Sequence, residues 1–147
     1  MTKVELLNKA IKIAEKAHKG QTDKYDVPYI GHVMRVMNAG KTLDEKIVGV
    51  LHDVVEDNPE YNLNYLAEIG FPEPILFAIK CLTKTEEDVV YDEFIKKIEQ
   101  SPLAVAVKIN DLIDNMDIKR VNRELTHKDF KRFQKYHKAY LYLIEKY

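Results

Sequence analysis

The chain has 147 residues, of which 46% are hydrophobic and 32% charged, with a net charge of −1. This is the composition of one soluble globular domain, and no apolar run approaches the roughly 18 residues that a membrane span needs. The N-terminus lacks the apolar core of a signal peptide, and the single cysteine, Cys81, cannot form an internal disulfide. We therefore expect a cytoplasmic protein with no membrane partner.

Signals for helices occur along the whole chain, and no hairpin is evident. Thr2 and Thr42 are each followed three residues later by glutamate, which is the capping-box pattern of a helix start. A polar loop with Gly20 and Pro28 separates the first two helices. We predict helices after Thr2, over 29–38, 43–55, 63–69, 74–82, 86–100 and 103–117, and after Thr126. Residues 104–109 could also form a buried strand, but their helical neighbours favour a helix. The predicted fold class is all-α: a single-domain bundle of seven or eight helices over residues 1–147.

Charge is distributed unevenly along the chain. Residues 118–147 hold nine Lys and Arg against three Asp and Glu, a net charge of +6. A basic tail can bind nucleic acid. Its apolar residues, however, recur at three- and four-residue spacing, which is typical of a helix with one packed face and one solvated face. We therefore expect no nucleic-acid partner, although the tail helix could lend cations to a bound phosphate.

The feature with the clearest chemical meaning is His52-Asp53, which lies inside an apolar segment predicted to be helical. A buried His-Asp pair is costly unless something compensates its charge, and a divalent ion does so well. His32 lies in a second amphipathic helix, and Asp111 follows the apolar run 105–109. These four residues are the predicted metal ligands, with positions left for water and a substrate phosphate.

Two acids, Glu56 and Asp57, follow the predicted ligand pair directly. Acidic residues oppose the dipole at the end of a helix, so a purely structural role explains them poorly. Carboxylates beside a metal suit the orientation and deprotonation of a nucleophile. We therefore predict that Glu56 and Asp57 are catalytic.

The order His32, His52-Asp53, Asp111 resembles the H…HD…D metal site of the HD phosphohydrolase superfamily. Four longer segments, 17–21, 28–32, 51–57 and 107–115, resemble the hydrolase domain of RelA/SpoT-type proteins. The bifunctional members of that family carry a further nucleotidyl-transfer domain that 147 residues would not hold. The resemblance is therefore to the stand-alone small alarmone hydrolases.

This resemblance implies that the four ligands hold Mn²⁺ and that Glu56 and Asp57 activate the attacking water. It also implies that the substrate is a nucleotide bound by Lys24 and Asn115, with Lys108 supporting the phosphates or the acidic pair. The reaction would remove the 3′-pyrophosphate from guanosine tetra- or pentaphosphate.

Asp23 stands where this family usually carries an arginine that grips the nucleotide. An anion at this place favours the alternative that the hydrolase acts on another phosphorylated nucleotide, such as a dinucleotide phosphate or a nucleoside polyphosphate. A second alternative is a non-catalytic, metal-stabilised binding or regulatory domain. The two acids after the ligand pair argue against it, because a structural ion needs no general base.

Overall fold

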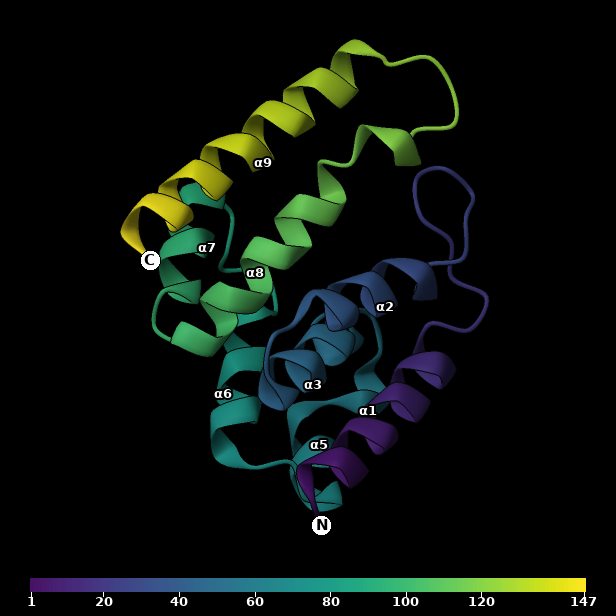
Figure 1. Ribbon diagram of the computed structural model, residues 1–147, viewed down its shortest axis with the longest axis vertical. Helices are drawn as coiled ribbons and strands as arrows, with labels where there is room; N and C mark the ends of the chain where they lie inside the picture. The colour runs from purple at the N-terminus through teal and green to yellow at the C-terminus, as the bar shows by residue number, and fades with distance from the viewer.

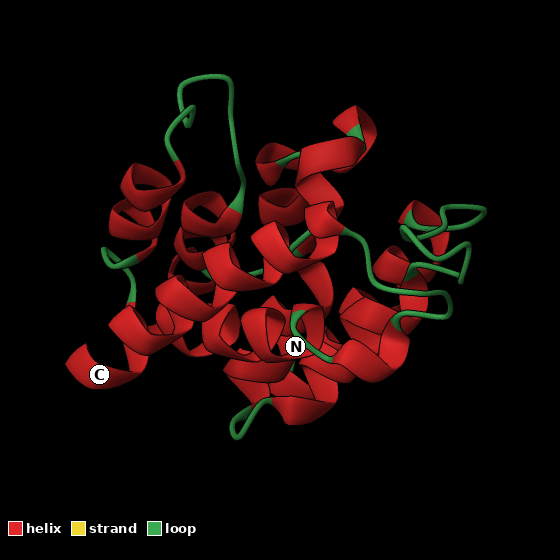
Figure 2. Cartoon of the chain, turned by 90° about the horizontal axis from the view of Figure 1, so that it is seen from above, coloured by secondary structure: helices red, strands yellow, loops and turns green.

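The computed structural model describes all 147 residues, and it consists of helices and loops without a strand (Figures 1 and 2). The all-α prediction is confirmed. The α-helices are α1 (Lys3–Ala17), α2 (Ile30–Ala39), α3 (Leu43–Leu51), α4 (Val54–Asp57), α5 (Leu63–Ile69), α6 (Glu73–Leu82), α7 (Tyr91–Ile98), α8 (Pro102–Asn115) and α9 (His127–Lys146). Short 3₁₀ turns lie at Pro59–Tyr61 and Ile118–Arg120.

Helix α3 is the centre of the bundle. It packs against α1, α2, α6 and α8, and every residue from Ile47 to Leu51 is buried. Gly49 lies where α3 meets α2, and a Cβ atom placed on it would come within 3.2 Å of the backbone of Met37 and Val36. The absence of a side chain at this position therefore allows the two helices, and the residues they carry, to approach closely.

Helix α9 closes the bundle along α8 (Figure 1), and both termini of this long helix are held by specific contacts. Thr126 and Asp129 form a capping box at its start, and the Asp129 carboxylate accepts hydrogen bonds from Arg123 and Arg132. Near its end, Leu143 is fully buried. The helix therefore presents its other basic side chains along a fixed edge of the bundle.

Most predicted helix ends are confirmed. The Thr2 capping box is complete, and the Asn62 side chain accepts a hydrogen bond from the Tyr65 amide to start α5. Gly70 ends α5 in the left-handed region with φ +119°. Residues 104–109 lie within α8 and are helical, as expected. None of the helices combines the length and the apolar character that crossing a membrane would require.

The prediction of one helix over 43–55 was wrong. The helix ends at Leu51 and resumes at Val54, so His52 and Asp53 lie at a break rather than inside a helix. The His52 ring accounts for the break, because its Nδ1 donates to the carbonyl oxygen of Gly49 at 2.6 Å. A side chain that occupies a carbonyl of the preceding turn competes with the helical hydrogen-bond pattern.

The prediction of a helix over 86–100 was also wrong in its first turn, because α7 begins only at Tyr91. The Asp88 carboxylate accepts hydrogen bonds from the amide and the hydroxyl of Thr85, and it pairs with Lys97 at 2.7 Å. Such local side-chain bonds favour a turn over a helix. They also hold the Thr83–Thr85 segment beside the site described next.

Candidate metal and nucleotide site

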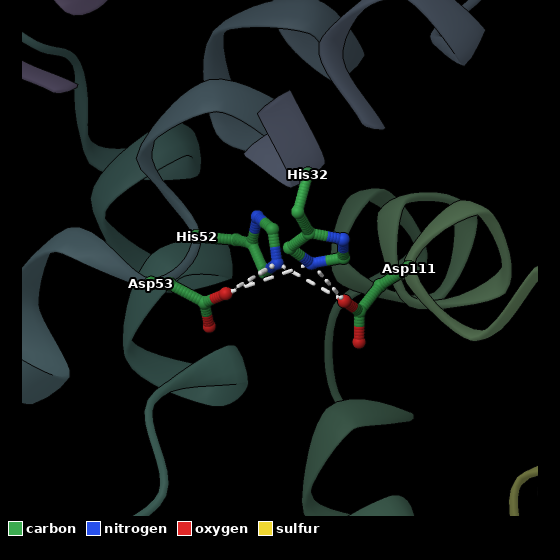
Figure 3. A group of neighbouring side chains, drawn as sticks. All are labelled: His32, His52, Asp53 and Asp111. Atoms are coloured by element: carbon green, nitrogen blue, oxygen red, sulfur yellow. Dashed lines mark hydrogen bonds and ion pairs between the residues drawn. The ribbon is translucent and has the colours of Figure 1, made fainter. Parts of the chain in front are cut away.

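Four side chains from three parts of the chain converge in the interior of the bundle (Figure 3). They are the predicted ligands His32 of α2, His52 and Asp53 of the break after α3, and Asp111 of α8. One potential ligand atom from each lies within 4.8 Å of all the others. The three elements pack against one another, so the cluster is a product of the central helix contacts.

Both imidazole rings are oriented by a bond on the side away from the cluster. His32 Nδ1 donates to Asp114 Oδ2 at 2.6 Å, and His52 Nδ1 donates to Gly49 O. Each Nε2 atom therefore faces the carboxylates of the cluster. His32 Nε2 lies 2.9 Å from Asp111 Oδ1, and His52 Nε2 lies 3.0 Å from Asp53 Oδ2. This arrangement is typical of metal-binding histidines, in which one nitrogen is held by a partner and the other is the ligand.

The cluster is electrostatically polarised. Burial alone would lower the pKa of His52, but Asp53 and Asp111 outweigh it and hold that pKa well above its usual value. Burial would raise the pKa of Asp53, but His52 lowers it to about 2. Tyr29 adds a hydrogen bond from its hydroxyl to Asp53. The two carboxylates therefore attract positive charge to the site. Together with the two imidazoles, they form a ligand set that suits a divalent ion.

Lys108 lies against this cluster. Its ammonium donates to Asp111 Oδ2 at 2.9 Å, and only 11% of its side chain is exposed. Lys108 forms no ion pair with Glu56 or Asp57, although the resemblance had allowed it to support that acidic pair. Lys108 thus holds Asp111 through Oδ2, whereas both histidines contact Oδ1. The Asn115 amide also donates to Oδ1, at 3.1 Å.

The two predicted catalytic acids differ in position. Glu56 lines a cavity of about 210 Å³ together with His52, Asp53 and Asp111 of the cluster. Burial, followed by the nearby charge of Asp53, raises the pKa of Glu56. Its carboxylate accepts a hydrogen bond from the Lys84 amide at 3.0 Å. Both side chains are exposed to solvent, but Asp57 does not line this cavity. Of the two acids, Glu56 is the one placed to exchange a proton with a molecule at the cluster.

A second, larger cavity of about 430 Å³ adjoins the first. Its lining includes the predicted substrate residues Lys24 and Asn115, together with Arg120 and Arg132. Three residues, Tyr29, Asn115 and Tyr136, line both cavities. Burial and the charge of Arg132 lower the pKa of Lys24, which is the response of a cation surrounded by other cations. The combined space therefore leads from a positively charged cavity to the cluster of metal-ligating side chains.

Asp23 does not present an unpaired anion in the larger cavity. Its carboxylate accepts hydrogen bonds from the amides of Tyr25 and Val27, at 2.8 and 3.1 Å, and from Arg120 at 3.2 Å. Despite burial, these bonds lower its pKa. Asp23 thus shapes the loop and binds Arg120, which lies in the 3₁₀ turn after α8.

Sequence reasoning missed Asp114, Arg120 and Tyr29 as site residues. Asp114 follows Asp111 by three residues and so lies on the same helix face, a spacing that could have identified it. Arg120 belongs to the basic tail, for which the sequence predicted a solvated face that could lend cations to a bound phosphate, without naming a residue. Its bond to Asp114 spans six residues, but its bond to Asp23 joins residues 97 apart, and no local pattern predicts the second contact.

We expect Asp114→Asn to weaken binding of a divalent ion about 10- to 100-fold, the usual effect of losing the partner of a ligating histidine. The carboxylate holds the Nδ1 proton of His32 and is itself held by Arg35 and Arg120. Calorimetric titration of the ion measures the change. Asp117→Asn, which removes a carboxylate near the end of the same helix without contact to His32, is the matched control. An Asp114 variant with unchanged affinity would contradict the positioning role.

Comparisons with known proteins add two relatives, and no family model matches the chain. The GTP pyrophosphokinase of Streptomyces coelicolor is 28% identical over 122 residues, which cover 75% of this chain and 14% of that protein. The probable GTP pyrophosphokinase of Mycobacterium leprae is 26% identical over 125 residues, which cover 77% of this chain and 16% of that protein. The chain thus matches about one sixth of the length of these relatives.

These names overturn the expected function. A pyrophosphokinase transfers a pyrophosphate group to a nucleotide, whereas the predicted alarmone hydrolase would remove it. The assignment to the HD hydrolases, the 3′-pyrophosphohydrolase activity and both of its alternatives were therefore wrong. The physical reason lies in what the residues determine: metal ligands and neighbouring acids orient a metal-bound polyphosphate, but they do not decide whether water or a hydroxyl group attacks it.

Proposed function

We propose that this chain binds a divalent ion and a guanine nucleotide and takes part in pyrophosphate transfer to that nucleotide, the reaction for which its relatives are named. The observation that carries the proposal is the continuity of the two cavities. A cluster with four potential metal ligands opens, past Tyr29, Asn115 and Tyr136, into a cavity lined by cations. Nucleotide polyphosphates need both a metal ion and cationic side chains to neutralise their charge.

The ion would be held by His32, His52, Asp53 and Asp111. Among divalent ions we favour Mn²⁺ over Mg²⁺, because imidazole nitrogen ligates manganese while magnesium prefers oxygen ligands alone. When bound, the ion would neutralise phosphate oxygens and make the phosphorus more electrophilic. The role of both histidines as ligands is supported by their Nδ1 hydrogen bonds, which leave the Nε2 lone pairs for the metal.

The nucleotide would occupy the larger cavity. Lys24 and Arg132 would contact its phosphates, and the Asn115 amide would orient the group that enters the smaller cavity. Arg120, already bonded to Asp23 and Asp114, would hold the loop that carries Lys24 rather than the ligand itself. The cavity volume of about 430 Å³ lies within the range of small-molecule sites.

Glu56 would act as the general base. A hydroxyl oxygen of the guanine nucleotide attacks a phosphorus atom of the donor, ATP. The bond from that phosphorus to the leaving AMP oxygen breaks, and the hydroxyl proton passes to the Glu56 carboxylate. The raised pKa of Glu56 brings it closer to the value that suits a base near neutral pH. Asp57 would contribute through its charge, which is one cause of that raised pKa.

The test is a transfer assay with ATP, GTP and Mn²⁺. The expected result is one AMP formed for each guanine nucleotide that gains two phosphates. Glu56→Gln is expected to lower the rate about 10²- to 10⁴-fold while Mn²⁺ and GTP still bind. Glu60→Gln, a change of an exposed acid just beyond α4, is the matched control and keeps the rate.

Two results would overturn the proposal. One is the absence of AMP although the protein binds both Mn²⁺ and GTP. The other is release of pyrophosphate to water from a guanine nucleotide when no ATP is present, because the acceptor would then be water and not a nucleotide hydroxyl. The same assay with Mg²⁺ in place of Mn²⁺ tests the metal assignment, and a faster reaction with Mg²⁺ would contradict it.

A further inference from the structure

Three lysines from different parts of the fold line the small cavity beside the metal cluster. Lys84 follows α6, Lys108 belongs to α8 and Lys135 to α9. Lys108 is neutralised by Asp111 at 2.9 Å. Neither of the other two ammonium groups has a carboxylate within 4.0 Å, although carboxylates are abundant in this chain. Two unneutralised lysines therefore face a cavity that already holds a third.

The position of Lys135 is held by aromatic rings. Its ammonium lies 4.8 Å from the centre of the Tyr91 ring and 5.3 Å from that of Tyr136. At these distances the rings attract the ammonium through cation–π contacts. Burial, followed by repulsion from Lys84 and Lys108, lowers the pKa of Lys135. Because Lys135 is exposed, solvent screens this repulsion in part, and a bound anion would relieve the remainder.

Two further features of the cavity wall concern the Tyr91 hydroxyl and the loop that carries Lys84. The Tyr91 hydroxyl is buried in the cavity wall and has no hydrogen-bond partner. Buried hydroxyl groups are normally paired, so an unpaired one at a cavity is available to bond a ligand atom. The backbone amide of Lys84 is bonded to Glu56, which fixes the loop that brings this lysine to the cavity.

We propose that Lys84, Lys135 and Tyr91 form a pyrophosphate-binding subsite that holds the outer phosphates of a ligand whose inner phosphate lies at the metal cluster. The cavity of about 210 Å³ is too small for a nucleoside and suits a compact anion. The subsite rests on the proposed function, because it places a phosphate chain at the cluster. It specifies the ligand class as well: molecules that end in a diphosphate bind here, and monophosphates bind much less tightly.

The test uses inorganic pyrophosphate as the probe and the full chain loaded with Mn²⁺. Lys84→Ala and Lys135→Ala are each expected to weaken pyrophosphate binding about tenfold, the usual effect of losing one charge-assisted hydrogen bond. Binding of inorganic phosphate is expected to change less than threefold, because a single phosphate reaches only the cluster. Lys128→Ala, an exposed lysine on the same helix, is the matched control and binds pyrophosphate as the unchanged protein does.

Titration of Mn²⁺ into each variant provides a second readout, and its affinity is expected to stay unchanged. Pyrophosphate binding that both lysine variants retain would overturn the subsite, as would equal losses for phosphate and pyrophosphate. This experiment needs no turnover. A failed transfer assay with lysine-dependent pyrophosphate binding would therefore reject the transfer reaction and leave the subsite standing.

Discussion

Asp111→Asn is expected to abolish binding of a divalent ion and to lower the free energy of unfolding by about 3–5 kcal/mol, the cost of breaking a buried ion pair. The carboxylate meets both histidines and Asn115 through one oxygen and Lys108 through the other. It is held ionised even though burial would raise its pKa, because Lys108 and the two imidazoles outweigh burial and keep that pKa well below its usual range. Asparagine supplies one neutral oxygen where the cluster needs a charge.

The two effects of this substitution can be separated. In Asp111→Asn the Lys108 ammonium stays buried without a counter-charge, so adding Lys108→Met should recover most of the lost stability and none of the metal binding. Urea denaturation in the presence of a chelator measures the first effect, and calorimetric titration of Mn²⁺ measures the second. Metal affinity that survives in the single variant would show that Asp111 is no ligand.

Gly49→Val is expected to destabilise the protein by about 2–3 kcal/mol, in the upper part of the range for overpacked cores. The contacts that a Cβ would make are with backbone atoms of Met37 and Val36, which cannot rotate away as a side chain can. The only relief is a shift of α3 away from α2. Since His32 and His52 belong to these two segments, the shift would separate the ligands and weaken Mn²⁺ binding about tenfold or more.

Ala67→Val is the matched control for that experiment. It adds the same branched carbons to an exposed position of α5 and should cost only about half a kcal/mol of helix propensity. Thermal unfolding of both variants and titration with Mn²⁺ compare them directly. If Gly49→Val were as stable as the control, or kept full metal affinity, the close approach of α2 and α3 would not be what forms the site.

Local sequence signals predicted much of this fold because they act within a few residues. The Thr2, Asn62 and Thr126 caps each depend on a side chain three residues from its partner amide. The two errors have the same origin. At His52 and Asp88 a polar side chain bonds to the nearby backbone and competes with the helix. The spacing of apolar residues carries no information about such a bond.

The candidate site was predictable only in part. Four polar residues in apolar segments predicted a cluster that the structure brings together, because burying such groups requires compensation. The contacts of Arg120 and Lys135 depend on how α9 and its preceding loop return to the bundle. The direction of the reaction was not predictable from these residues either, since the same groups can serve water or a hydroxyl as the attacking group.

The candidate ligands are far apart in the chain: His32 and His52 lie 79 and 59 residues from Asp111. Because closing long loops costs conformational entropy, we expect these residues to come together late in folding. A partly folded chain would therefore hold the ion poorly, and the ion would stabilise almost only the complete fold. At an ion concentration 100 times its Kd, that linkage adds about 2.7 kcal/mol to the free energy of unfolding. The melting temperature would then depend on the supply of metal, so that the concentration of the ion sets the range of temperature over which the protein stays folded.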